Sequence, residues 1–285
     1  MSLGLLCSGR LGYQTLLKLL EKYQINFVFT DSKSKNIIQF CEQNKLRVFV
    51  GNPRNGRAKE FIAKNECEIL ISINYLFLIE QDIINLSKGL TFNIHGSLLP
   101  KYRGRTPHVW AIINDEKFTG ITAHIIDEGC DTGDILEQIK ISIEPNDTGD
   151  NILTKYESNY LPLIEKVIDS FNQGKLKPKK QDPKKATYYG KRIPDDGLIN
   201  WNWQKERIYN WIRAQAHPYP GAFTFLHGKK ITIDEISYSD DGYEYKQPNG
   251  MVLNSHPLII KTPNGAVEIK SFREKIELTK GQVLI

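Results

Sequence analysis

The sequence has few cysteines, no long apolar run and little surplus charge of either sign. Its four cysteines, Cys7, Cys41, Cys67 and Cys130, lie far apart and form no C-x-x-C pair. This spacing excludes a disulfide framework and the common zinc sites, so we expect reduced thiols and no bound metal. No window approaches the roughly 18 apolar residues of a membrane span, and residues 1–10 do not resemble a signal peptide. We therefore expect a cytoplasmic protein that does not engage membranes.

The charges are close to balance along the whole chain. Lys and Arg number 38 against 33 Asp and Glu, which gives a net charge of +5. Residues 1–180 carry 23 basic and 21 acidic groups, and residues 181–285 carry 15 and 12. Because affinity for nucleic acid grows with the number of phosphates neutralised, this balance disfavours a nucleic-acid partner. With 40% hydrophobic and 25% charged residues, the 285-residue chain is typical of a globular protein of one large and one smaller domain.

Short apolar strands alternate with helical segments in the first part of the chain. We predict strands at residues 3–7, 25–30, 46–50, 68–73, 89–95, 119–126 and 135–143, and helices at 16–23, 35–44, 57–65, 109–114 and 147–171. Near-continuous apolar strands separated by helices are typical of a parallel sheet with helices on both faces. The sequence therefore predicts an α/β first domain.

The composition changes in Gly174–Lys185, which contains six lysines, two prolines and almost no apolar residue. We interpret this segment as a solvated linker and divide the chain into domains of residues 1–180 and 181–285. A helix is predicted at 205–215, followed by short strands at 222–226, 230–236, 251–253, 258–261 and 266–272. Short strands at this spacing favour a small β-barrel or sandwich as the second domain.

Two segments contain the residue types that catalysis requires. Asn93 and His95 are two apart at the end of a predicted strand, so both side chains point to the same face. An amide donor beside an imidazole suits a developing oxyanion, and the imidazole can also move a proton. The acidic loop Asp127–Asp134 offers a carboxylate that orients His95 or accepts a proton. The residues alone leave open a structural Asn93–His95 pair and a solvated acidic turn.

The chain resembles the formyltransferases that use 10-formyltetrahydrofolate. The resemblance rests on FNIHGSLLPKYRG (residues 92–104), TGITAHIIDEGCDTGDIL (119–136) and RAQAHPYPGAF (213–223), and it extends over about residues 1–227. It implies a Rossmann-like formyltransferase domain and a smaller, barrel-like β-rich C-terminal domain. It also implies a catalytic triad at Asn93, His95 and Asp131. In the implied mechanism an amine attacks the N10-formyl carbon, Asn93 and His95 stabilise the oxyanion, and Asp131 helps to remove the proton.

The resemblance also suggests where the substrates bind. We expect folate at Tyr75 and around Asp127, Gly129 and Cys130, and the acceptor at Ser8, Gly9 and Arg10, where an arginine fork suits a sugar or diphosphate. The remaining histidines, His124 among them, show no metal-like spacing, and we interpret them as structural or exposed.

The triad does not decide which amine is formylated, because the fold serves several acceptors. The ATYYGKRIPDDGLINW segment is more similar to sugar N-formyltransferases and to the formyltransferase half of the aminoarabinose pathway enzyme. We therefore expect a nucleotide-linked amino sugar, a dTDP-4-amino-4,6-dideoxyhexose such as the glucose form, made for O-antigen or other lipopolysaccharide synthesis. The alternatives are a methionyl-tRNA formyltransferase and a non-catalytic folate- or nucleotide-binding protein. Apolar strand residues near the carboxyl end favour a homodimer; they are Val252, Leu253, Ile259, Ile260, Val283 and Ile285.

Overall fold

The computed structural model describes all residues from Met1 to Ile285. The chain forms two compact units. The first comprises Met1–Gly104, Gly120–Ile141 and Leu153–Tyr188, and the second comprises Arg105–Thr119, Ser142–Ile152 and Tyr189–Ile285. The main passage from one unit to the other thus falls after Tyr188, and two shorter segments from within residues 1–180 belong to the second unit.

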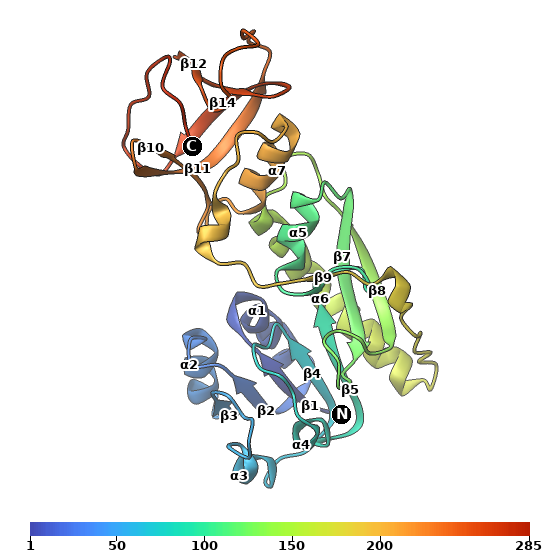
Figure 1. The fold of residues 1–285 in the computed structure, drawn as a ribbon. Coiled ribbons are helices and arrows are strands. Elements are labelled where there is room, and N and C mark those ends of the chain that lie inside the picture. Colours follow the sequence, from blue (N-terminus) through green and yellow to red (C-terminus); the bar gives the residue numbers. More distant parts are fainter. The chain divides into compact units, whose positions relative to one another are not determined.

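The first unit is built on a seven-stranded sheet in the order β3-β2-β1-β4-β5-β7-β8 (Figure 1). The strands are β1 (Ser2–Cys7), β2 (Gln24–Thr30), β3 (Arg47–Val50), β4 (Cys67–Ile73), β5 (Ser87–His95), β7 (Phe118–Ile125) and β8 (Ile135–Ser142). The first five strands pair in parallel, whereas β7 pairs antiparallel with β5. The predicted α/β, Rossmann-like class is confirmed, with a mixed rather than wholly parallel sheet.

Helices follow the strands, as the alternating pattern predicts. They are α1 (Gly9–Leu20), α2 (Lys35–Gln43), α3 (Lys59–Ile62), α4 (Gln81–Ile84) and α6 (Gly149–Asn172). The apolar stripe of α1 is buried at Leu11, Leu16 and Leu19. Thr148 precedes α6, and its hydroxyl accepts a hydrogen bond from the Asn151 N–H at 3.2 Å. None of the helices is both long enough and apolar enough to cross a membrane.

The second unit combines two helices with an antiparallel sheet in the order β10-β11-β14-β13-β12. Its elements are α5 (Pro107–Ile113), α7 (Lys205–Ala214), β10 (Ala222–Leu226), β11 (Lys229–Ser239), β12 (Val252–Ser255), β13 (Leu258–Thr262) and β14 (Gly265–Phe272). Residues 281–285 hydrogen-bond both to Val252 in β12 and to Phe225 in β10. This last segment joins the two outer strands, so the sheet closes on itself in the barrel-like form that we expected.

Three of the six strand residues on which we based a dimer are buried within the second unit. Val252, Ile259 and Ile260 are at most 1% exposed, whereas Ile285 is 71% exposed. Buried side chains offer no surface to a partner, so the apolar character of these strands is explained by the barrel itself. A homodimer stays a prediction.

Candidate active site

Asn93 and His95 lie at the carboxyl end of β5, and the neighbouring strand β7 brings a second histidine to them. In the antiparallel register Asn93 faces His124 and His95 faces Thr122. Side chains directly opposite each other on paired strands are near neighbours. His124 is thus not exposed: its ring is buried beside Asn93, within hydrogen-bond distance of the Asn93 amide.

The hydrogen bonds around His124 indicate which nitrogen carries the proton in its neutral ring and how the Asn93 amide is oriented. His124 Nδ1 lies 2.9 Å from the carbonyl oxygen of Ile125, which can only accept, so Nδ1 carries the proton in the neutral ring. His124 Nε2 is then an acceptor, and Asn93 Nδ2 donates to it at 3.0 Å. This assignment orients the Asn93 carboxamide and leaves its second N–H for another partner.

His95 lies between two acceptors. Its Nε2 donates to the carbonyl oxygen of Tyr102 at 2.7 Å, and its Nδ1 is 3.4 Å from Oδ1 of Asp131. In the neutral ring Nδ1 carries no proton and faces the carboxylate; a proton taken up there is shared with Asp131. Burial lowers the pKa of His95, and the charge of Asp131 opposes this in part. A neutral imidazole with a free Nδ1 is prepared to accept a proton.

Asp131 completes the cluster from the loop between β7 and β8. Its Oδ2 accepts the Gly104 N–H at 2.9 Å, and its Oδ1 lies 3.6 Å from Nε2 of His124. Burial raises the pKa of Asp131, but the His124 and His95 rings in their protonated forms and the Gly104 N–H outweigh it and hold this pKa well below its usual range. Asp131 is thus a carboxylate at neutral pH. Its φ of 56° is left-handed, a conformation that few residues other than glycine adopt.

The segment between His95 and Arg103 is fixed by hydrogen bonds to its backbone. Thr122 Oγ1 donates to the Ser97 carbonyl at 2.6 Å, and the Tyr156 hydroxyl donates to the Gly96 carbonyl at 2.8 Å. Gln138 donates to the Leu99 carbonyl at 3.0 Å. These bonds hold the Tyr102 carbonyl where it meets His95, so the S-L-L-P-x-Y-R-G sequence supplies rigidity as well as chemistry.

The predicted folate residues occupy two different surroundings. Asp127, Gly129 and Cys130 are exposed, and the Asp127 carboxylate shapes their turn by accepting the Gly129 N–H and the Thr132 hydroxyl. Tyr75 instead packs against the apolar cluster beneath β4, and its hydroxyl is buried without a hydrogen-bond partner. Burial raises the pKa of Tyr75 accordingly. Its hydroxyl is not accessible to a ligand in this conformation.

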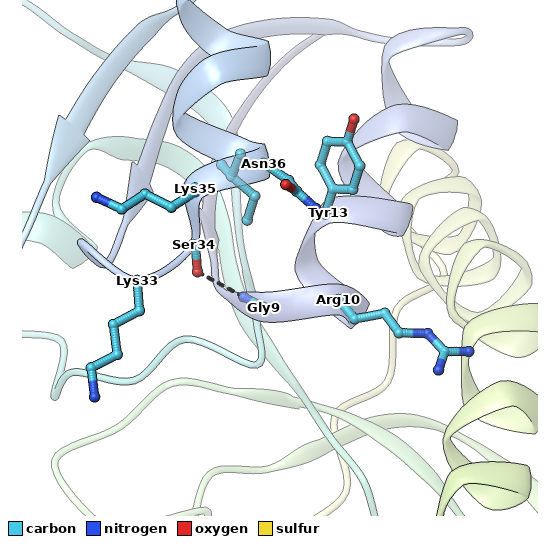
Figure 2. A pocket seen from close by; sticks show the side chains of 8 residues that line it. Gly9, Arg10, Tyr13, Lys33, Ser34, Lys35 and Asn36 are labelled. Carbon is cyan, nitrogen blue, oxygen red and sulfur yellow. Dashed lines mark hydrogen bonds between the residues drawn. The ribbon is translucent and has the colours of Figure 1, made fainter. Parts of the chain in front are cut away.

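Two of the three predicted acceptor residues, Gly9 and Arg10, line an open pocket (Figure 2), whereas Ser8 is buried and does not line it. Ser8 precedes α1, and the Gly9 N–H donates to the Ser34 hydroxyl at 2.9 Å. Lys33 and Lys35 extend from the same rim, and Figure 2 shows Arg10 pointing away from both. The reason is an ion pair, because Arg10 Nε lies 2.6 Å from Oε1 of a glutamate in α6, Glu157. The predicted arginine therefore forms a salt bridge with its own chain in this conformation.

The chain belongs to the formyl transferase family. Residues 17–167 match the formyl transferase domain, and residues 192–280 match the formyl transferase C-terminal domain. The chain is 36% identical over 274 residues to the bifunctional polymyxin resistance protein ArnA of Wigglesworthia glossinidia brevipalpis. This alignment covers 94% of the chain but 40% of that relative, so the chain spans about two fifths of its length. The family that the motifs indicated is confirmed.

Solved structures share the fold at lower identity. The sugar 3N-formyl transferase WlaRD, solved with dTDP and 5-N-formyl-THF, matches with a TM-score of 0.71 and 24% identity over 97% of this chain and 99% of that one. An N-formyltransferase from Helicobacter canadensis, in complex with folinic acid and dTDP-3-aminofucose, matches with a TM-score of 0.69 and 21% identity, over 94% of this chain and 97% of that one. A methionyl-tRNA formyltransferase from Clostridium thermocellum matches with a TM-score of 0.57 and 19% identity, over 85% of this chain and 95% of that one. The fold is thus common to enzymes with different acceptors.

Proposed function

We propose that the protein is an N-formyltransferase that moves the formyl group of 10-formyltetrahydrofolate to the amino group of a nucleotide-linked amino sugar. The observation that carries the proposal is the cluster of Asn93, His95, His124 and Asp131, which joins an amide donor, a neutral imidazole and a buried carboxylate. Transfer of a formyl group to an amine needs a donor to the developing oxyanion and an acceptor for the proton of the amine. The cluster contains both.

Each member of the cluster has a distinct part in this reaction. 10-Formyltetrahydrofolate would supply the formyl carbon and its carbonyl oxygen. The free N–H of Asn93, held in place by His124, stabilises the negative charge that develops on that oxygen. His95 takes up a proton from the acceptor amine at Nδ1, directly or through water, and Asp131 stabilises the resulting imidazolium. The protonated Nδ1 would then donate to the oxyanion, as the sequence predicted for His95. When the tetrahedral intermediate collapses, the bond between the formyl carbon and N10 would break and this proton would pass to N10, which releases tetrahydrofolate and the N-formylated acceptor.

The residues around the cluster fit a folate. Leu76 and Leu78 in the loop after β4 are 41% and 65% exposed, although both are apolar. This loop follows the strand that pairs with β5, since Ser72 of β4 is the partner of Asn93. Exposed apolar side chains beside a polar site suit a flat heterocycle such as a pterin. The exposed turn Asp127–Cys130 offers backbone groups for its hydrogen-bonding edge.

The acceptor is proposed to be a dTDP-linked 4-amino-4,6-dideoxyhexose used for O-antigen or another surface polysaccharide. The structures with dTDP and with dTDP-3-aminofucose support a dTDP-sugar. A structure described as a 4-N formyltransferase, from Francisella tularensis, supports the amine position, with a TM-score of 0.66 and 22% identity over 81% of this chain. The near balance of charge in residues 181–285 argues against tRNA.

A product assay by mass spectrometry tests this function. Purified protein is incubated with 10-formyltetrahydrofolate and a panel of dTDP-, UDP- and GDP-linked amino sugars, beside charged initiator tRNA. We expect a formyl mass gain on a dTDP-amino sugar. Formylation of tRNA alone would replace the proposed acceptor but keep the chemistry of the cluster. Folate binding without any product would favour the non-catalytic alternative.

A further inference from the structure

One segment that follows the first unit's last helix contacts the Asp131 loop directly. Residues 179–188, here called the strap, lie partly in what the sequence suggested was a solvated linker. The strap is anchored by Lys179, whose N–H and carbonyl both bond to Ile135 at 2.8 Å. Its other end is anchored at Thr187, whose carbonyl accepts the Arg103 N–H at 2.9 Å. Most of residues 175–185 are exposed, as the linker interpretation predicts, but these hydrogen bonds attach residues 179–187 to the first unit.

Gln181, near the start of the strap, uses both N–H donors and the carbonyl oxygen of its side-chain amide in hydrogen bonds. Its Nε2 donates to the carbonyl oxygens of Asp131 and Gly133 at 2.9 and 2.7 Å. Its Oε1 accepts from Nε and Nη2 of Arg103 at 3.2 and 2.6 Å. Two carbonyls on one side and a guanidinium on the other fix the orientation of the carboxamide. Neither glutamate nor an apolar side chain can make both sets of bonds.

Arg103 connects the strap to the other anchor of Asp131. It is 3% exposed, and its Nη1 donates to the hydroxyl of Tyr188 in the strap at 2.5 Å. The next residue, Gly104, donates its N–H to the Asp131 carboxylate. Gln181 in the strap thus holds the backbone carbonyl of Asp131, and the Gly104 N–H holds its carboxylate. Arg103 links the two, because it bonds to Gln181 and directly precedes Gly104 in the chain.

We infer that Gln181 is a positioning residue for Asp131, and that the strap keeps the Asp131 carboxylate at the distance from His95 that proton transfer requires. The inference rests on the proposed function for its catalytic meaning. Its structural basis is the left-handed backbone of Asp131, a conformation that persists only where neighbouring groups hold it. Gln181 supplies such groups, because it donates hydrogen bonds to the backbone carbonyls of Asp131 and Gly133. A carboxylate displaced by about 1 Å is enough to slow a reaction severely.

The test compares Gln181→Ala and Gln181→Glu with Lys180→Ala, an exposed neighbour in the strap that takes no part in these bonds. Gln181→Glu keeps the acceptor for Arg103 but loses both donors to the Asp131 loop. We expect kcat to fall about tenfold in both Gln181 variants, equivalent to about 1.4 kcal/mol, with the acceptor KM within about twofold. Lys180→Ala should match the wild type.

Two further readouts separate positioning from general destabilisation. In Gln181→Ala the acid limb of the kcat/KM profile should move to lower pH, because His95 is the proton acceptor and the negative charge of Asp131, which raises the pKa of His95, moves away from it. Hydrogen exchange at Gly104 should quicken. The inference would be overturned if the Gln181 variants had the same kcat as Lys180→Ala. It would also be overturned if their loss of kcat only matched the loss of folded protein while hydrogen exchange at Gly104 stayed unchanged. If the wild-type protein formylates no acceptor but the Gln181 substitutions still speed hydrogen exchange at Gly104, the proposed function fails, whereas the role of Gln181 in holding the Asp131 loop is retained. If Gln181→Ala does not fold, Gln181→Met replaces it.

Discussion

Asp131→Asn is the substitution that most directly tests the proposed chemistry, because it changes charge and proton capacity with little change in shape. The amide oxygen can still accept the Gly104 N–H, which now meets the carboxylate at 2.9 Å. The amide nitrogen then faces Nδ1 of His95, which lies 3.4 Å from Asp131 Oδ1. An amide N–H donates to the free Nδ1, so His95 loses the position at which it takes up a proton.

The expected loss follows from that geometry. His95 Nε2 is already committed to the Tyr102 carbonyl at 2.7 Å, so the ring has no second site for the proton. Without a carboxylate partner, a buried imidazolium also becomes less stable. Removal of a general acid–base function costs about 10²–10⁴ in rate, equivalent to about 3–5 kcal/mol of transition-state stabilisation. We expect a fall of that size in kcat.

The assay is formylation of the acceptor followed by mass spectrometry, with folate affinity and thermal unfolding measured on the same preparations. Asp131→Asn should retain folate binding and a melting temperature near that of the wild type. Asp169→Asn, in the exposed part of α6, serves as the matched control and should keep full activity. A kcat within threefold of wild type for folded Asp131→Asn would refute the role given to the carboxylate.

Three other substitutions test separate features. His124→Ala removes the acceptor that orients the Asn93 amide, and we expect kcat to fall about five- to tenfold with folate affinity retained; an unchanged kcat would show that Asn93 is held by other means. Gly133→Ala would place a methyl carbon 1.8 Å from the Ile125 carbonyl oxygen, so the loop must shift, and urea unfolding should show a loss of about 1–3 kcal/mol. Burial lowers the pKa of His108 from 6.5 to about 4. Between pH 6.5 and about 4 the His108 side chain is protonated in the unfolded chain but not in the folded protein. The free energy of unfolding should therefore fall by up to about 3 kcal/mol as the pH drops from 7 to 4. His108→Phe should flatten that slope, and an equal slope in both proteins would contradict the argument.

The fold was accessible from the sequence because its strands are short apolar runs between turn residues. The predicted strand 68–73 is β4 (Cys67–Ile73), and the predicted strand 258–261 is β13 (Leu258–Thr262). Local pattern does not reveal which strands pair, so the antiparallel β7 and the closure of the barrel by residues 281–285 were not predicted. Both depend on contacts between segments far apart in the chain.

Spacing along the chain pointed to the candidate site only where its residues share one strand, and the family resemblance added Asp131. The spacing of Asn93 and His95 placed them on one face, and in the structure His95 lies near Asp131 while Asn93 contacts His124. His124 could have been found by pairing the two predicted strands in antiparallel register, but nothing in a single sequence fixes that register. Gln181 gave no signal at all, because it lies among lysines and its partners are backbone carbonyls.

The D-x-G-x-D-T-G pattern that identifies the family combines two physical requirements. A side chain at Gly129 would approach the Thr132 hydroxyl to 2.0 Å, and one at Gly133 would meet the Ile125 carbonyl, so both positions need glycine for space. Asp127 and Thr132 hydrogen-bond each other to close the turn. Only Asp131 of this loop reaches His95. Most of the motif therefore builds the scaffold that presents one carboxylate, which explains why it identifies the formyl transferase fold clearly and says nothing about which amine is formylated.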